Sequence, residues 1–455
     1  MVMPIIALRM RREVVGMANQ IAVLKNASEV RLEEQFTTLQ ATLPGLAQTR
    51  AAAFREFSSK GLPNKRVEEF KYTDIRTFLT DIVPLAEKPS TADAHAVLGT
   101  AKAFRNVDAF RVVMINGYFI AELSDIAAVP GGVEVIPLAQ ALADSHPLLG
   151  KIGSLAKAGD NPLYQLNSAF MSDGAIIRIG KEVKLGKPLH VRFVSGSEAL
   201  ATATRLLVLV EEGAEVTLVE SHEGPDGTAS QMNDVVDLIV ADGAVVEHVR
   251  LNAEGQDVLA LSTVTARLGA HVSFSSINAV AGSKVARHQI YVAFEGSHST
   301  AQINGTAMLS GQQHADATLV ADHIAPNCDS RELFKTVIDG DAVGVFQGRI
   351  NVAAEAQKTD GKMMSACVLL SDTGAMFNKP ELEIFADDVQ CGHGATCGTL
   401  DDDLLFYLMA RGLPRPEAES LMIQAFIGEA IEVVKHDEVR EELIGSVANW
   451  LKHRR

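Results

Sequence analysis

The chain of 455 residues is long enough for two or three domains, and 47% hydrophobic with 22% charged residues is typical of a globular protein rather than a disordered one. Its 41 basic and 57 acidic residues give a formal net charge of -16. That balance argues against nucleic acid or an anionic membrane as the main partner, because both attract basic patches. No apolar run is long enough to cross a bilayer.

The N-terminal residues are apolar and then basic, the reverse of the order in a secretory signal. The alternatives for residues 1–16 are a weak targeting segment and, favoured here, a mis-called start, with translation beginning at Met17. The four cysteines and the lack of a signal predict reduced thiols in a cytoplasmic protein, without a disulfide framework.

Residues 1–105 are predicted to form an N-terminal helical region. Apolar residues at Leu32, Phe36, Leu39 and Leu43 follow a helical period, which ends at Pro44 and Gly45. A second helix is expected over 49–60. The charged and aromatic stretch that follows, 61–75, indicates a surface loop with a short helix.

Residues 106–395 carry short Val, Ile, Leu and Thr runs separated by Gly, Asp, Asn and Ser, the pattern of strands and turns. Glycine turns recur at a spacing of about 30 residues, with insertions. Such a period is typical of stacked coils, each of which needs its neighbours to bury its apolar face. The pattern favours a β-helix, with a β-sandwich as the alternative.

Residues 396–455 return to a helical pattern and are predicted to form a C-terminal helical domain. Asp401, Asp402 and Asp403 suit a helix N-terminus, Gly412 suits a helix end, and Pro416 suits the next start. The apolar positions after Asp401 extend around more of the helix than one buried stripe requires. We therefore expect some of this surface either to bind a partner or to cap the open end of the β-helix. The candidate partner-binding residues are Leu405, Phe406, Tyr407 and Arg411.

The stretch Cys391-Gly-His-Gly-Ala-Thr-Cys-Gly398 allows three interpretations. Its cysteines could be small buried hydrophobes, a thiol and histidine could form a nucleophilic pair, or Cys391 and His393 could bind a metal. Residues 391 and 393 share one face of a strand, since side chains alternate. Two ligands are too few for a closed metal site, so the rest would come from another chain.

The same stretch resembles the C-x-H-G-A-T-x-G signature of SufD proteins, members of the SufB/SufD family in the bacterial Suf iron-sulfur cluster assembly machinery. The resemblance continues in further blocks of the chain. They are Gly348-Arg-Ile-Asn-Val352, Ala356-Gln-Lys-Thr-Asp360, Leu369-Leu-Ser371, Lys379-Pro-Glu-Leu-Glu-Ile-Phe-Ala-Asp-Asp-Val389, Leu405-Phe-Tyr-Leu408 and Glu68-Glu-Phe-Lys-Tyr-Thr73, the last with Phe70 where the family usually has Trp.

The resemblance implies a right-handed parallel β-helix between N-terminal and C-terminal helical regions. It also implies a non-catalytic scaffold that pairs with a SufB paralogue and binds the SufC ABC-type ATPase through its C-terminal helices. His393 is then the expected ligand of iron or of a nascent cluster shared with the partner, and Cys391 its less certain neighbour. Self-association in the absence of SufB stays open.

Two positions depart from or refine the family pattern. Cys397 stands where many SufD sequences have an apolar residue, so we expect either a buried hydrophobe or a third thiol. Gly394 matches SufD, whereas SufB proteins carry an acidic residue there. The alternatives are a SufB-type paralogue and a stand-alone β-helix enzyme acting on polysaccharide, although the acids are too scattered for the latter. No G-x-x-x-x-G-K-[ST] loop occurs, so no ATP site is expected on this chain.

Overall fold

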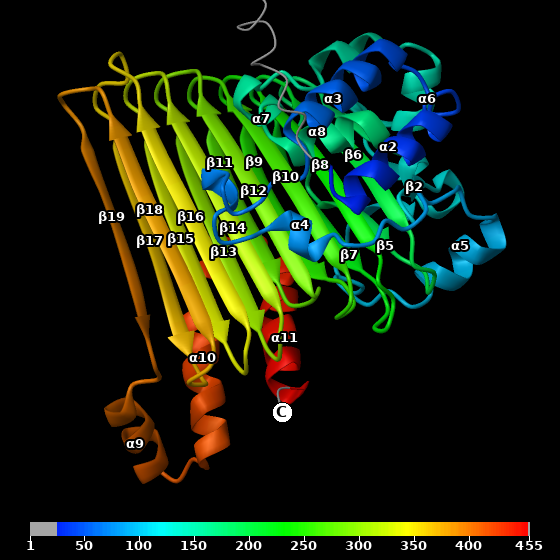
Figure 1. The fold of residues 1–455 in the computed structure, drawn as a ribbon. Helices are drawn as coiled ribbons and strands as arrows, with labels where there is room; N and C mark the ends of the chain where they lie inside the picture. The colour runs from blue at the N-terminus through cyan, green and yellow to red at the C-terminus, as the bar shows by residue number, and fades with distance from the viewer. Residues whose placement is uncertain (1–24, 454–455) are drawn as a thin grey trace, which may run out of the picture.

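The computed structural model describes residues 25–453, and its core is a parallel β-helix made of two stacked sheets (Figure 1). The expected start at Met17 lies outside the described residues. From β4 onwards, successive strands alternate between the sheets, so every coil contributes one strand to each. The nine-stranded sheet contains β3 (Val133–Pro137), β4 (Asp173–Ile179), β6 (Ala201–Val210), β8 (Gln231–Val240), β10 (Leu259–Leu268), β12 (Val285–Phe294), β14 (His314–His323), β16 (Val343–Val352) and β18 (Ala375–Ile384).

The ten-stranded sheet lies opposite and starts with an antiparallel pair, β1 and β2. Its strands are β1 (Phe110–Ile115), β2 (Tyr118–Phe119), β5 (Leu189–Val194), β7 (Glu215–Glu223), β9 (Val245–Ala253), β11 (Ser273–Val280), β13 (Thr300–Leu309), β15 (Asp329–Ile338), β17 (Asp360–Leu369) and β19 (Gln390–Gly398). The pairing from β4 to β19 is parallel, which excludes the β-sandwich alternative.

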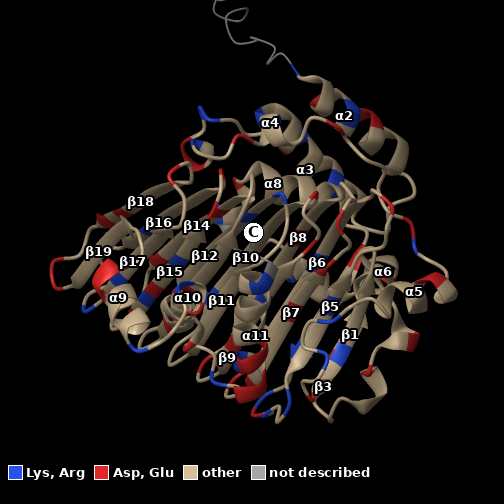
Figure 2. Cartoon of the chain, turned by 90° about the horizontal axis from the view of Figure 1, so that it is seen from below, with Lys and Arg blue, Asp and Glu red and all other residues tan. Residues whose placement is uncertain are grey.

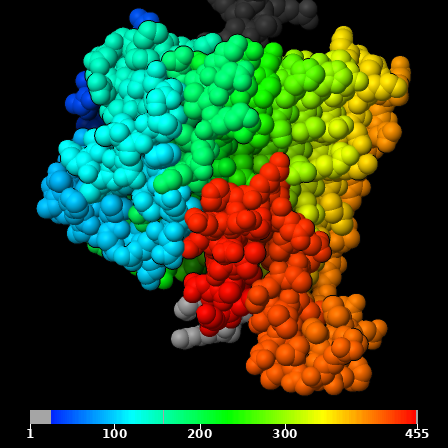
Figure 3. All heavy atoms as spheres, turned by 180° about the vertical axis from the view of Figure 1, so that it is seen from behind, coloured from blue at the N-terminus to red at the C-terminus, as the bar shows by residue number. Residues whose placement is uncertain are grey.

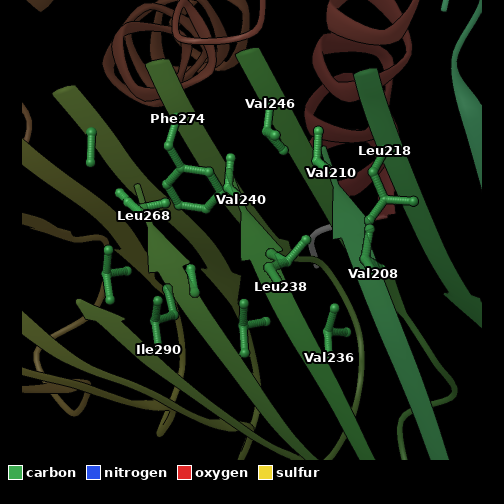
Figure 4. Packing of buried hydrophobic residues seen from close by; sticks show 14 of the residues in the cluster. Val208, Val210, Leu218, Val236, Leu238, Val240, Val246, Leu268, Phe274 and Ile290 are labelled. Carbon is green, nitrogen blue, oxygen red and sulfur yellow. The ribbon is translucent and has the colours of Figure 1, made fainter. Parts of the chain in front are cut away.

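The coils stack in register, so equivalent apolar side chains form rows inside the β-helix. One row joins Val210, Val240, Leu268 and Phe294 through consecutive parallel pairs. Figure 4 shows residues of this row with side chains of the ten-stranded sheet in the same buried cluster. The turn at Gly213 has φ +66°, a conformation that glycine adopts without steric cost. The predicted repeat of coils is therefore confirmed.

Helices cover the outer face of the nine-stranded sheet at its N-terminal end (Figure 1). Phe36 and Phe54 stack at a centroid distance of 4.2 Å, and Phe170 meets both rings edge-on. The sequence pattern did not indicate the helices within 138–170, because short segments begun by caps such as Asn161-Pro162 carry little periodicity. The helices and 3-10 turns of this half are α2 (Ala27–Leu39), α3 (Ala47–Lys60), η1 (Glu68–Phe70), α4 (Ile75–Phe78), α5 (Thr91–Leu98), η2 (Ala121–Leu123), η3 (Ile126–Ala128), α6 (Leu138–Ala143), η4 (Pro147–Lys151), α7 (Ala156–Gly159) and α8 (Pro162–Phe170).

The segment around η1, expected to be a surface loop, is anchored on the nine-stranded sheet. Phe70 is buried with the guanidinium of Arg287 4.0 Å from its ring centroid, and Arg287 Nη2 donates to the carbonyl oxygen of Glu69 at 2.7 Å. Thr73 Oγ1 is hydrogen-bonded to His314 Nε2 at 2.9 Å. These contacts tie the N-terminal region to β12 and β14, so the Phe at position 70 fills a core position.

The C-terminal helices are α9 (Asp402–Ala410), α10 (Arg415–Ile431) and α11 (Asp437–His453). Buried residues such as Ile427 and Leu443 pack on outward-facing Val249 and Ile277, so α10 and α11 cover the outer face of the ten-stranded sheet rather than its open end. Asp401 Oδ1 accepts from the Leu404 N–H at 3.0 Å, which confirms the expected helix start. No helix among the described residues is long and apolar enough to span a membrane.

Both sheets end at the last coil. β18 and β19 are terminal strands, and no described strand pairs with their outer edges. Large apolar side chains are exposed there, among them Phe385 at 71%. Such edges offer free backbone N–H and C=O groups to another chain.

Candidate functional site

The strand β19 holds the residues that the motif analysis singled out. In its parallel pairing with β17, Cys391 lies opposite Gly361, His393 opposite Met363, and Cys397 opposite Cys367. These alternate positions share the face of β19 that looks toward the interior of the β-helix, where Cys391 packs against the main apolar core. Since no further coil covers β19, the interior face of this last strand is exposed at the open end of the β-helix.

Cys391 is half-buried, and this burial affects the protonation of its thiol. Burial raises the pKa of Cys391, a hydrogen bond with the Gly361 backbone lowers it in part, and the carboxylates of Asp360 and Glu332 raise it further. The thiol therefore holds its proton at neutral pH, and a bound metal ion would have to displace it.

His393 is exposed, two residues further along the strand. Within 25–453, no side chain or backbone group is hydrogen-bonded or ion-paired to its imidazole. Gly392 and Gly394 flank it, and neither adds a side chain that would shield it. An imidazole held at the open edge without an internal partner can serve as a ligand for a metal ion at a contact with another chain.

Cys397 differs from the expectation of a buried hydrophobe. Its side chain is exposed, because the coil that would cover it is missing, whereas Cys367 beside it is buried. The second expectation for this position, a third thiol on the strand, fits its exposure.

The predicted partner-binding residues divide into buried and exposed members. Leu405 is only 3% exposed and α9 packs on α10, so this side chain holds the helix in place. Phe406 is 73% exposed and Tyr407 51%. The Arg411 guanidinium lies 4.3 Å from the centroid of the Tyr407 ring. The pattern alone could not tell which side of the apolar helix would be buried.

The helix α9 stands away from the body of the molecule (Figure 3). Its charges are concentrated in the first turn, and most of the remaining helix is uncharged (Figure 2). Together with exposed Leu404 and Met409, the two aromatic side chains form an apolar surface, which we call the α9 surface. A protruding apolar surface of this kind is typical of a protein-binding site.

A second group of polar side chains, which the motif analysis missed, lies inside the β-helix. Glu220, His222 and Asp234 are buried with potential ligand atoms within 4.8 Å of one another. The sequence contained a signal for this group. Glu220 and His222 continue the alternate, inward-facing positions of Val216 and Leu218 on β7, and such positions are usually apolar.

The guanidinium of Arg250 fills this internal group. Its Nη1 lies 3.1 Å from Glu220 Oε2 and 2.9 Å from Asp234 Oδ2, and it also contacts His222 Nε2. Burial opposes ionisation of Glu220, but hydrogen bonds from His222 and His248 and the charge of Arg250 hold its pKa well below the usual range. The arrangement is therefore an internally hydrogen-bonded structural network, with an arginine where a metal ion would sit.

The neighbouring Glu254 yields a pH prediction. Burial, with Glu223 and Asp234 nearby, raises its pKa from 4.5 to about 8, and neither carboxyl oxygen has a side-chain partner among the described residues. A raised pKa contributes stability fully below the unfolded-state value, and this contribution is lost as pH rises through the folded-state value. We expect Glu254→Gln to unfold like wild type near pH 4.5 and to become the more stable protein by pH 8, since each tenfold difference in proton affinity between the folded and unfolded states corresponds to about 1.4 kcal/mol.

Urea unfolding of both proteins across this pH range measures the difference. Glu122→Gln, at an exposed position, is the control and should follow wild type throughout. A constant difference between Glu254→Gln and wild type at all pH values would contradict the assignment.

Comparison with known proteins gives matches along most of the chain. The family model of the SufBD core domain of the SUF iron-sulfur cluster assembly system matches residues 193–426, and the model of the SufBD N-terminal region matches 32–191. An iron-sulfur cluster assembly SufBD family protein of Synechocystis is 28% identical over 436 residues, covering 92% of this chain and 95% of its own length. The Escherichia coli iron-sulfur cluster assembly protein SufD is 28% identical over 397 residues, covering 86% of this chain and 90% of its own.

Proposed function

Since the chain belongs to the SufBD family of iron-sulfur cluster assembly proteins, we propose that it is a SufD-type scaffold subunit without catalytic activity of its own. In this role it pairs with a SufB-like paralogue, binds a SufC-like ABC-type ATPase, and contributes to iron acquisition and nascent cluster assembly. The observation that carries the proposal is the position of Cys391 and His393 on β19, whose outer edge pairs with no described strand at the open end of the β-helix.

The paralogue is assigned to the open end of the β-helix. The outer edges of β18 and β19 offer backbone groups to a further strand, and the exposed side chains of Phe385 and Ile384 offer apolar contact area. A partner that pairs there buries the face of β19 on which His393 lies. Gly394 matches the SufD pattern rather than the SufB pattern, which supports the SufD-type assignment of this chain.

Iron, or a nascent cluster, is the cargo of the proposed site. A thiolate and an imidazole are ligands that iron accepts, and Cys391 with His393 supplies one of each. The partner has to supply the remaining ligands, since two groups cannot close a site. The chain's own part is to hold these two side chains at fixed positions on one strand face.

The ATPase is assigned to the α9 surface. Phe406 and Tyr407 are exposed aromatic side chains, and Arg411 is stacked on one of them, a composition that recurs in the dominant contacts of protein interfaces. The helices α10 and α11 are committed to the outer face of the ten-stranded sheet. Removing the whole C-terminal region would expose that apolar face, so single substitutions on α9 are the cleaner test.

We expect Phe406→Ala to weaken ATPase binding by about tenfold or more, because loss of a central aromatic contact typically costs over about 1.4 kcal/mol. The fold should be unaffected, since this side chain contacts mainly solvent in the chain alone. The measurement is a calorimetric titration of the purified chain with the ATPase. Ile444→Ala, at an exposed apolar position on α11, is the matched control and should bind as wild type does.

The proposal as a whole is tested by affinity purification of the tagged chain under anaerobic conditions, after co-expression with a SufB-like paralogue and a SufC-like ATPase. We expect both proteins to co-purify in a stable complex. A chain that elutes alone would refute the scaffold assignment, and equal binding by the Phe406 and Ile444 variants would refute only the α9 surface.

A further inference from the structure

Two cysteines outside the candidate metal site face each other across neighbouring strands. Cys367 of β17 and Cys397 of β19 are register partners in the parallel pairing of the two strands. Neighbouring strands are about 4.8 Å apart, which lies within the range of Cα separations that a disulfide bridges, about 4.4–6.8 Å. The two side chains therefore lie side by side on the same face of neighbouring strands.

This thiol pair is separate from Cys391 and His393. Cys397 lies six positions after Cys391, which is about 20 Å along an extended strand. The fourth cysteine, Cys328, is buried and its Sγ donates to the carbonyl oxygen of Gly296 at 3.3 Å. Among the described residues, Cys367 and Cys397 therefore have only each other as thiol neighbours.

We propose that Cys367 and Cys397 form a reversible oxidation site, in which hydrogen peroxide converts the two thiols into an intrachain disulfide. The exposed Cys397 reacts first, as its sulfur can be reached from solvent. Its sulfur attacks one peroxide oxygen, an S–O bond forms and the O–O bond breaks, and the second oxygen leaves as water after taking the thiol proton. Cys397 is then a sulfenic acid.

Cys367 completes the reaction as the resolving thiol. Its sulfur attacks the Cys397 sulfur, the S–S bond forms and the S–O bond breaks, and a second water leaves with the Cys367 proton. Two thiols are thus oxidised while one peroxide is reduced to two waters. Burial, and next to it the neighbouring Cys397, raise the pKa of Cys367, so this buried thiol is the less reactive of the two toward peroxide.

A metal site is the weaker interpretation of the same pair. Two thiolates alone do not complete a tetrahedral site, and the described residues that cluster as three potential ligands are Glu220, His222 and Asp234, far from β19 along the coil stack. The oxidation site does not depend on the proposed function, because it concerns the chain alone.

The test uses the full-length reduced chain under argon, treated with equimolar hydrogen peroxide. We expect two of the four thiols to be lost, dithiothreitol to restore them, and peptide mapping to find Cys367 linked to Cys397. Retention of all four thiols, a disulfide involving Cys391, or a link between chains would each overturn the proposal.

Variants distinguish the two roles. Cys367→Ala should leave a sulfenic acid on Cys397 that dimedone traps, and Cys397→Ala should abolish disulfide formation. Cys391→Ala is the control, and it should form the same disulfide at the wild-type rate. Loss of the disulfide in this control would overturn the assignment. If a Cys367 variant fails to fold, the peptide map of the wild-type chain still decides the question.

Discussion

Cells carrying His393→Ala are expected to lose about tenfold or more of their iron-sulfur enzyme activity, while the variant chain folds and assembles as wild type does. The physical reason is the position of the side chain. His393 is exposed and forms no hydrogen bond or ion pair with other residues in 25–453, so its removal changes stability by less than about 0.5 kcal/mol. The loss then falls on the proposed metal site, which keeps only Cys391.

The measurement compares a cluster-dependent enzyme activity in cells that rely on this chain, with abundance and complex formation checked in parallel. Thr396→Ala is the matched control, since it is exposed on the same strand but points to the other face. Normal activity in His393→Ala cells together with failure in Cys397→Val cells would mean that the roles of these positions are reversed.

The second large effect is expected from Arg250→Met, which should lower the free energy of unfolding by about 3–5 kcal/mol. Methionine fills a similar volume but removes the cation that Glu220 and Asp234 share. Asp234 then loses its ion-pair partner in the interior, and Glu220 keeps only its hydrogen bonds with His222 and His248. The charge of Arg250 is one of the causes that hold the pKa of Glu220 low, so the deficit should shrink as the pH falls and Glu220 takes up a proton.

Urea unfolding measures this effect, with Arg267→Met as the control. Arg267 also forms an ion pair, with Glu295 at 2.8 Å, but both side chains are partly exposed. Breaking such a surface pair costs about 1 kcal/mol at most. Equal losses in the two variants would show that the interior network contributes no more than a surface pair.

The sequence was most informative where one periodicity dominated. The helix around Leu32 and the C-terminal helical region were predicted from spacing, and the glycine turns predicted the stacked coils. The resemblance added the order of the regions. The pattern could not show that the short stretch around Phe70 is anchored on β12 and β14, because those contacts join residues more than two hundred positions apart.

The candidate site was predicted only where local spacing was sufficient. Cys391 and His393 were recognised as a pair from alternate spacing, and the structure places them on one edge strand. Cys367 and Cys397 lie opposite each other because of the strand register, and Arg250 occupies the interior network because of packing. Neither register nor packing can be predicted from the local sequence. The burial of the Leu405 side chain depends on the position of α10, against which α9 packs.

The stacking of the coils has a consequence for the order in which the molecule opens. In a one-dimensional stack each coil is held by its two neighbours, and the last coil has only one. β18 and β19 should therefore fray first, and their amides should exchange with solvent faster than those of β8 or β10 in the middle. The strand that presents Cys391 and His393 is thus the least protected part of the β-helix. A chain that pairs with this edge supplies the missing neighbour and slows amide exchange most at β19.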